Sequence, residues 1–441
     1  MIPPSNPSDS SCSSRRQFLG RTAVGAAAFG FPTIIPNHVL GNASVASANE
    51  RVNIGYIGCG RRSNQLRGLP ADARIVALAD CNLLRAEADA ARYKCKSFQD
   101  YRKMLEMADL DAVVVATPDH WHTLASIHAC MAGKDVYVEK PMTLTIREGR
   151  QLTNAARKYE RIVQCGSQQR STNANVLACR LVREGAIGRI LRVEAANFET
   201  PWSCNLPSQP VPTGIDWDMW LGQSQPHPYH EDIYRPRAKP GWISFRRWSG
   251  GEMTGWGAHG LDQIQCALGM ENSGPVEIWT EGKPFAPPTW TEPGDRGIGD
   301  KQCSSPIVMM KYANGVELKF SGGARGGGTF YGEKGTIWID RGSLKADPAD
   351  IVQTYKDEMR QDKDPTQKHL ANWIDCIKSR ERSVADVEIG HRSATLCHLG
   401  NIARWAGGRL TWDPVGEQFK EKEANRFVQR EQRKGYEIPD V

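Results

Sequence analysis

Residues 52–60, VNIGYIGCG, decide the fold of the chain. An apolar run ends in the turn Gly58-Cys59-Gly60, and residues able to form a helix follow it, so the segment predicts a buried strand, a tight turn and a helix. Further apolar runs alternate with helical patterns. The runs are residues 75–79, 112–116, 136–138 and 162–164, and the helical patterns are residues 83–93, 101–107, 123–131 and 146–159. This alternation predicts a doubly wound parallel sheet covered by helices on both faces.

The glycine turn has the features of a dinucleotide site. Gly58 and Gly60 begin the pattern G-x-G-x-x-G/A, Ser63 takes its third position, and Asp80 stands at the end of the second strand, twenty residues past Gly60. Glycines let the backbone approach a pyrophosphate, and an acid at this spacing binds the ribose hydroxyls. An ordinary glycine turn is the alternative.

Asp80 also bears on the choice of cofactor. A carboxylate there repels the extra phosphate of NADP, so NAD is favoured over NADP. Arg61, Arg62 and Arg85 lie nearby in the sequence and could offset this preference.

The second half of the chain has a different pattern. After a helix at 175–184, runs of strand character predict a mostly antiparallel sheet, and Asn314-Gly315 predicts a hairpin. The strand runs are residues 190–198, 276–280, 307–312, 316–320 and 336–339, and later helices are expected at 367–378 and 391–406. We therefore expect an α/β protein with a dinucleotide-binding domain at 49–170. An α+β domain for substrate binding and oligomerisation should follow at 171–441, with a charged, exposed arm at its end.

The N-terminus resembles an export signal. Ser14-Arg15-Arg16-Gln17-Phe18-Leu19 precedes an apolar run at 22–35, and Ala46-Ser47-Ala48 follows as a small-residue cleavage pattern. The run is too short and too rich in glycine to span a membrane. We interpret residues 1–48 as a twin-arginine signal, which implies recognition by the twin-arginine translocase, export in the folded state with a cofactor inside, and a periplasmic location.

Charge and cysteine content exclude several classes. The net charge of +6 is dispersed without a block of Lys and Arg, so no nucleic-acid partner is expected. Of the twelve cysteines, Cys12 leaves with the signal, and the other eleven have no spacing suited to zinc, so no metal site is expected. An odd number of cysteines in a chain that folds before export also argues against a disulfide framework. One or two disulfide bridges formed after export are the alternative. No second apolar stretch is long enough to span a membrane.

Three further motifs carry a family resemblance. Thr117-Pro118-Asp119-His120-Trp121-His122 follows the 112–116 strand, Glu139-Lys140-Pro141 closes the next one, and Gly257-Ala258-His259 with Asp262 lies in the second half. Together with the glycine turn they resemble the glucose-fructose oxidoreductase / inositol dehydrogenase (Gfo/Idh/MocA) family. The resemblance implies an NAD(P)-dependent oxidoreductase that acts on the CH–OH group of a sugar, cyclitol (inositol-like) or sugar derivative, as a homodimer or homotetramer.

The resemblance also implies roles for individual residues. Lys140 contacts the substrate hydroxyl and His259 is the acid or base, with Asp262 orienting the imidazole or serving as an ordinary helix carboxylate. The residues expected to bind the cofactor are Gly58, Cys59, Gly60, Arg61, Asp80, Thr117, Pro118, His122, Glu139 and Lys140. Substrate contacts are expected from Arg170, from Arg246 or Arg247, and from Trp248. The alternative for Trp248 is that its ring packs in the hydrophobic core instead of stacking on a sugar.

One position departs from the family pattern. Many members carry an aspartate four residues before the histidine, where this chain has Gly255, and Asp262 or Glu252 could substitute for it. Three functions stay open. The leading one is a sugar or cyclitol oxidoreductase, the second is redox-neutral, NAD-dependent glycoside cleavage, and the third is a non-catalytic sensor of nucleotide and sugar.

Overall fold

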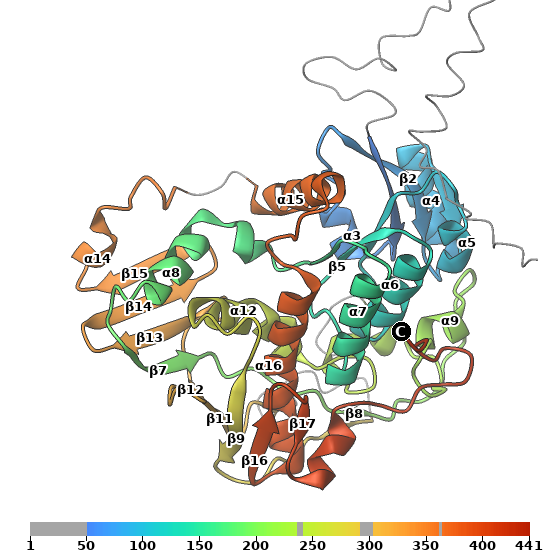
Figure 1. The fold of residues 1–441 in the computed structure, drawn as a ribbon. Coiled ribbons are helices and arrows are strands. Elements are labelled where there is room, and N and C mark those ends of the chain that lie inside the picture. The colour runs from blue at the N-terminus through green and yellow to red at the C-terminus, as the bar shows by residue number, and fades with distance from the viewer. Residues whose placement is uncertain (1–50, 236–240, 292–302, 361–363) are drawn as a thin grey trace, which may run out of the picture. The chain divides into compact units, whose positions relative to one another are not determined.

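The structure, a computed structural model, describes residues 51–235, 241–291, 303–360 and 364–441 (Figure 1). The predicted signal lies outside these ranges. Among the described residues, no helix combines the length and hydrophobicity that a membrane crossing requires.

The first half forms a six-stranded sheet in the order β3-β2-β1-β4-β5-β6, and its strand pairs run parallel. The strands are β1 (Val52–Ile57), β2 (Ala73–Ala79), β3 (Lys96–Phe98), β4 (Ala112–Val115), β5 (Asp135–Val138) and β6 (Val163–Cys165). This is the order of the doubly wound dinucleotide-binding fold. The order reverses between β1 and β4, so a crevice forms beyond their carboxyl ends.

Helices cover both faces of this sheet, as predicted. They are α3 (Arg61–Gln65), α4 (Leu83–Tyr93), α5 (Tyr101–Leu105), α6 (His122–Met131) and α7 (Ile146–Lys158), joined by α15 (Pro365–Ser379) from late in the chain. Val113 and Val115 of β4 pack in one core with residues of α5, α6 and α7. Val114, between them, packs in a second core with α4 and with Trp373 of α15. The continuous apolar strands are thus buried on both sides.

The second half forms a nine-stranded sheet in the order β15-β14-β13-β7-β12-β11-β9-β16-β17. Among its pairs only β12 and β7 run parallel within the described residues. The strands are β7 (Ile190–Ala195), β9 (Pro275–Glu281), β11 (Ile307–Tyr312), β12 (Glu317–Phe320), β13 (Gly328–Gly332), β14 (Gly335–Asp340), β15 (Ser343–Asp347), β16 (Arg409–Asp413) and β17 (Gln418–Phe419). The expected hairpin at Asn314-Gly315 joins β11 to β12. The predicted fold class is confirmed.

Three long helices pack on one face of this sheet: α8 (Asn173–Arg183), α12 (Gly257–Ala267) and α16 (Val387–Ala406). Short helices α9 (Trp217–Leu221), α10 (Glu231–Tyr234), α11 (Glu252–Gly255) and α14 (Asp350–Gln353) lie in the connections, with the two-stranded ribbon β8 (Ser203–Cys204) and β10 (Thr289–Trp290). Arg150 of α7 pairs with Glu388 of α16 at 2.8 Å, and so links the two halves of the chain. All cysteines within the described ranges are free thiols.

Candidate active site

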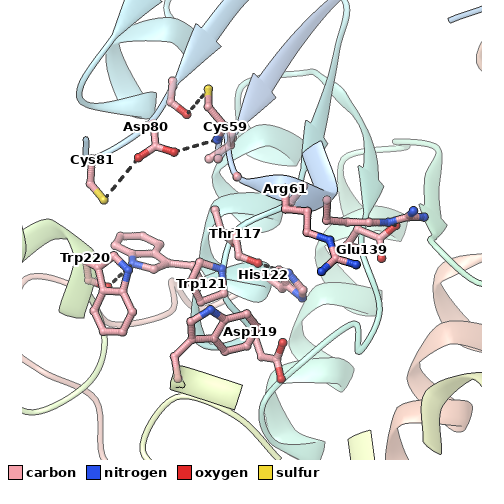
Figure 2. A pocket seen from close by; sticks show the side chains of 18 of the residues that line it. Cys59, Arg61, Asp80, Cys81, Thr117, Asp119, Trp121, His122, Glu139 and Trp220 are labelled. Atoms are coloured by element: carbon pink, nitrogen blue, oxygen red, sulfur yellow. Dashed lines mark hydrogen bonds and ion pairs between the residues drawn. The ribbon is translucent and has the colours of Figure 1, made fainter. Parts of the chain in front are cut away.

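A cavity of about 470 Å³ lies at the carboxyl ends of β1, β2, β4 and β5 (Figure 2). All the residues predicted to bind the cofactor line it: Gly58, Cys59, Gly60, Arg61, Asp80, Thr117, Pro118, His122, Glu139 and Lys140. The second half of the chain contributes Met219, Trp220, Tyr234, Trp242, Ile243 and Gly255. The volume is in the range of ligand pockets.

The glycine turn approaches β4 closely. Gly58 has φ +91°, and a Cβ there would lie 2.8 Å from the carbonyl oxygen of Ala116, so this position requires glycine. A Cβ on Gly60 would have no atom within 4 Å, so the backbone here faces open space. Ser63 is fully buried and its hydroxyl accepts a hydrogen bond from Arg67 Nη2 at 2.9 Å. The departure from glycine at the third position is therefore accommodated.

Asp80 holds the turn from the end of β2. Its Oδ2 accepts from the Cys59 N–H and its Oδ1 from the Asn82 N–H, both at 2.8 Å. Arg85 Nη1 lies 3.5 Å from Asp80 Oδ2, and its Nη2 donates to the hydroxyl of Tyr234 at 2.8 Å. Arg85 therefore joins the carboxylate to the second half of the chain.

Glu139 has a buried ion pair at the opposite wall. Arg62 Nε donates to Glu139 Oε1 at 2.8 Å, and Gln168 Nε2 donates to the same oxygen at 3.1 Å. Burial alone would raise the pKa of the Glu139 carboxyl, but the neighbouring Arg62 and Lys140 hold that pKa below its ordinary value. Glu139 is thus a fixed anion. A Cβ on Gly166 would lie 2.7 Å from Glu139 Oε1, so this glycine makes room for it.

His122 ties the ends of β4 and β5 together. Its Nδ1 lies 2.7 Å from the carbonyl oxygen of Pro141 and its Nε2 lies 2.9 Å from that of Thr117. Both ring nitrogens are therefore used by the backbone. In Figure 2 the ring lies beside Thr117, above Asp119. The two bonds hold the ring in place at the cavity wall.

Lys140 reaches across to the second half of the chain. Its Nζ donates to the carbonyl oxygen of Gly255 at 3.0 Å. Gly255 ends α11, and His259 lies on the first turn of α12 with 7% of its surface exposed. The backbone of Gly255 thus meets the lysine where many family members carry an aspartate. The catalytic roles of Lys140 and His259 stay predictions.

Asp262 and Arg170 contact each other. Arg170 Nε donates to both carboxylate oxygens of Asp262 at 2.8 and 3.0 Å, and the Ser393 hydroxyl donates to Asp262 Oδ1 at 2.6 Å. Arg170 also pairs with Glu271. Burial alone would lower the pKa of Arg170, but the two carboxylates raise it above its ordinary value. Asp262 and Arg170 were predicted for catalysis and for substrate contact, and these bonds favour a structural role for both.

Arg246 and Trp248 lie apart from the cavity wall. The Arg246 guanidinium carbon lies 4.0 Å from the centre of the Trp405 ring, a cation–π contact on the surface. Trp248 is fully buried in an aromatic core with Phe245 and Trp220. The structure therefore places Trp248 in the core, the alternative reading of its aromatic ring. A buried ring in this position cannot stack on a sugar.

Comparison with known families decides the identity of this fold. Two family models match the chain. The model described as "Oxidoreductase family, NAD-binding Rossmann fold" matches residues 52–167, and the model described as "Oxidoreductase family, C-terminal alpha/beta domain" matches residues 173–438. The chain belongs to the Gfo/Idh/MocA family. The resemblance inferred from the sequence motifs is confirmed, and the first domain is the NAD-binding domain of this family.

Individual relatives cover parts of the chain. Glycosyl hydrolase family 109 protein 2 of Shewanella sp. is 31% identical over 212 residues, 41% of this chain and 45% of that protein. Levoglucosan dehydrogenase of Pseudarthrobacter phenanthrenivorans is 32% identical over 135 residues, 30% of this chain and 34% of that protein. The chain thus spans less than half the length of these curated relatives.

Solved structures support the fold. The WlbA dehydrogenase from Bordetella pertussis, in complex with NADH and UDP-GlcNAcA, matches with a TM-score of 0.59 at 20% identity. The match covers 82% of this chain and 98% of that one.

The cavity fits a dinucleotide. Thr117 Oγ1 and Arg62 Nη2 are buried without a hydrogen-bond partner among the described residues, and both residues line the cavity. A ligand with hydroxyl and phosphate oxygens would satisfy them. Gly60 leaves room for its pyrophosphate, and Asp80 lines the cavity at the end of β2, where this fold binds the ribose. No cluster of three metal-ligating side chains occurs within the described ranges.

Asp80→Ser is expected to shift the cofactor preference from NAD toward NADP. The substitution removes the carboxylate that repels a 2′-phosphate and leaves Arg85 to pair with it. We expect the Kd for NAD to rise and that for NADP to fall, each by about tenfold, measured by titration calorimetry. Asp109→Ser, at an exposed carboxylate of the same domain, is the control. An unchanged ratio of the two constants would show that Asp80 does not select the cofactor.

The C-terminal arm, residues 428–441, supports the 119–122 segment, which contributes Trp121 to the cavity wall. Arg430 Nε donates to Glu148 Oε1 at 2.6 Å and its Nη2 to the carbonyl oxygen of His120 at 3.0 Å. The Tyr436 ring lies 5.7 Å from the Trp121 ring. The arm was predicted to be exposed, but these contacts pack it against the first domain, because Arg430 finds a buried carboxylate there.

Arg430→Met is expected to weaken NAD binding by about tenfold, because the 119–122 segment loses its charged anchor. Stopped-flow titration with NAD measures the effect. The exposed Arg426→Met, just before the arm, should leave the affinity unchanged. Equal affinities for both variants would mean that the arm does not influence the cofactor site.

Proposed function

We propose that the chain transfers a hydride between NAD and a secondary alcohol of a sugar, cyclitol or sugar derivative. The observation that carries this proposal is the bond from Lys140 to Gly255, which joins the end of β5 to the helix pair bearing His259. Lys140 shares its cavity with the glycine turn and Asp80. A proton-transfer pair beside a dinucleotide site is the arrangement that alcohol oxidation requires.

Each residue has a distinct task in this proposal. The turn at Gly58–Gly60, Asp80 and Glu139 would hold NAD, which supplies the hydride acceptor. Lys140 donates to the substrate hydroxyl oxygen and stabilises the negative charge that develops there. His259 accepts the hydroxyl proton, a task suited to imidazole near neutral pH. Asp262, bound to Arg170 and Ser393, fixes the helix that carries His259.

Turnover on a panel of sugars and cyclitols tests the proposal. The protein without residues 1–48 is incubated with NAD and each compound, and NADH is followed by absorbance. We expect NADH formation with at least one compound and none with His259→Ala. If NAD binds but no compound is oxidised, net dehydrogenation is contradicted, and the second candidate function is tested next.

Redox-neutral glycoside cleavage is the second candidate. It is favoured by the 31% identity to a protein named glycosyl hydrolase family 109 and by the absence of a carboxylate at Gly255. Transient oxidation of the sugar would acidify the neighbouring C–H, and elimination would release the aglycone. Release of nitrophenol from nitrophenyl glycosides without accumulation of NADH distinguishes this reaction from net dehydrogenation.

A non-catalytic sensor is the third candidate. The presence of both Lys140 and His259 argues against it. A double alanine variant that behaves like the wild type in every activity assay would support the sensor.

Export by the twin-arginine translocase to the periplasm is part of the proposal. Cofactor bound before export would supply NAD where the free nucleotide is scarce, and coupled substrates would then reoxidise it. Replacing Arg15 and Arg16 by lysine should retain the protein in the cytoplasm, as detected by fractionation. Cleavage after Ala48 is checked by the mass of the exported chain.

We also propose a homodimer or homotetramer formed through the second sheet. Its face away from α8, α12 and α16 carries the large side chain of Trp338, 40% exposed. Analytical ultracentrifugation should give a mass of two or four chains, and a monomer at micromolar concentration would contradict this.

A further inference from the structure

His259 lies beside a cluster formed by Trp256, Arg325 and Glu199. Its ring lies 5.7 Å from the ring of Trp256. The guanidinium carbon of Arg325 lies 5.9 Å from the centre of the Trp256 ring, and Arg325 Nη2 donates to Glu199 Oε2 at 3.0 Å. The segment that bears Arg325 also touches α12, because a Cβ on Gly260 would lie 2.7 Å from the Arg325 carbonyl oxygen. Arg325 is therefore anchored beside the predicted acid or base.

The same cluster connects to Lys140. The backbone carbonyl of Glu199 accepts from the Met253 N–H at 2.8 Å at the start of α11. This helix ends at Gly255, whose carbonyl accepts from Lys140 Nζ. Glu199 and Lys140 are thus bound to opposite ends of one four-residue helix. The segments that carry Glu199 and Arg325 therefore pack against α11 and α12, the two helices that meet Lys140 and carry His259.

The Arg325–Glu199 pair is partly exposed. The Arg325 side chain is 39% exposed and that of Glu199 is 16% exposed. In contrast, Arg170 has a 5% exposed side chain that is bound to two carboxylates. Arg325 can therefore take the role of substrate contact that the sequence analysis gave to Arg170.

The chemistry of the pair selects a class of substrate. A guanidinium only donates hydrogen bonds and a carboxylate only accepts them, whereas a sugar hydroxyl does both. Adjacent hydroxyls can therefore bind to the two groups together, while the Trp256 ring offers an apolar surface to the C–H groups. A carboxylated sugar would be repelled by Glu199 and would compete with it for Arg325. Resting on the proposed function, we infer that Arg325, Glu199 and Trp256 form a subsite for a neutral polyol with adjacent hydroxyls.

Binding of matched ligands tests the subsite. The probes are myo-inositol, D-glucose and D-glucuronate, which differs from glucose by its carboxylate, titrated calorimetrically into the full chain with NAD present. We expect the wild type to bind at least one neutral probe and to bind glucose at least tenfold more tightly than glucuronate. Arg325→Met should raise the Kd for the neutral probes about tenfold. Glu199→Gln should reduce the ratio of the Kd for glucuronate to the Kd for glucose about tenfold.

The matched control is Arg189→Met, which breaks an exposed Arg–Glu pair in the same domain and should change nothing. If Arg325→Met does not fold, Arg325→Lys keeps the charge, loses the planar fork and should still weaken binding. Unchanged affinity in a folded Arg325 variant, glucuronate binding equal to that of glucose, or no binding of any neutral probe would overturn the subsite. Failure of the proposed function is distinct, because Arg325-dependent polyol binding would then occur without oxidation.

Discussion

Replacing Lys140 by methionine is expected to lower kcat by about a thousandfold, with little change in the affinity for NAD. Methionine has a similar length but cannot donate a hydrogen bond to the substrate oxygen or balance its developing charge. Steady-state kinetics on an oxidised substrate, together with calorimetric titration of NAD, measures the two effects. The result would separate catalysis from cofactor binding.

Lys103→Met is the matched control, because this lysine lies in the same domain with 67% of its side chain exposed. It should retain wild-type kinetics. A Lys140 variant within threefold of wild-type kcat would contradict the assignment and would leave Lys140 as a contact between domains. Arginine at this position should also fail, since its planar fork does not fit a point contact with one carbonyl.

Asp262→Ala is expected to lower the free energy of unfolding by about 3–5 kcal/mol. The substitution removes the bidentate partner of Arg170 and the acceptor of the Ser393 hydroxyl, at a carboxylate that is 1% exposed. Denaturation by urea, followed by circular dichroism, measures the change. The double variant Asp262→Leu with Arg170→Met should recover part of the loss, because no unpaired charge is then buried.

The same variant separates the two roles of Asp262. If it keeps wild-type stability and loses activity, Asp262 acts on His259, as the sequence predicted. If it loses stability and the folded fraction keeps its kcat, Asp262 only maintains the helix. The bonds to Arg170 and Ser393 lead us to expect the second result.

The first domain could be predicted from the sequence because its signals are local. The strand before Gly58 is continuous and apolar, and Asp80 stands at the spacing of a ribose-binding acid, so the cofactor residues appear together in one cavity. The short β3 of this domain was not predicted, and in the second half neither was β13. Its sequence GTFYG contains two glycines and has a weak strand pattern, and its conformation depends on pairing with β7 and β14.

The second half of the site depends on contacts distant in the sequence. In the sequence, Arg170, Arg246 and Arg325 are all arginines near turns and cannot be told apart. The fold shows that Arg170 pairs with a buried carboxylate, that Arg246 packs on the Trp405 ring, and that Arg325 lies against Trp256 beside His259. The glycine-rich run at 322–328, in which Arg325 stands, predicts only a flexible segment or a tight turn. Similarly, the charged C-terminal arm reads as solvent-exposed until Arg430 meets Glu148, 282 positions earlier.

The nucleotide carried by the protein tests the central claim most directly. The chain is folded in the cytoplasm without residues 1–48, purified, denatured, and its released nucleotide is identified by mass spectrometry before and after incubation with neutral polyols. We predict about one NAD or NADH per chain, with the balance moving toward NADH after incubation with a substrate. A protein that carries no nucleotide and does not bind added NAD would contradict the assignment of the cavity lined by Gly58, Asp80 and Glu139.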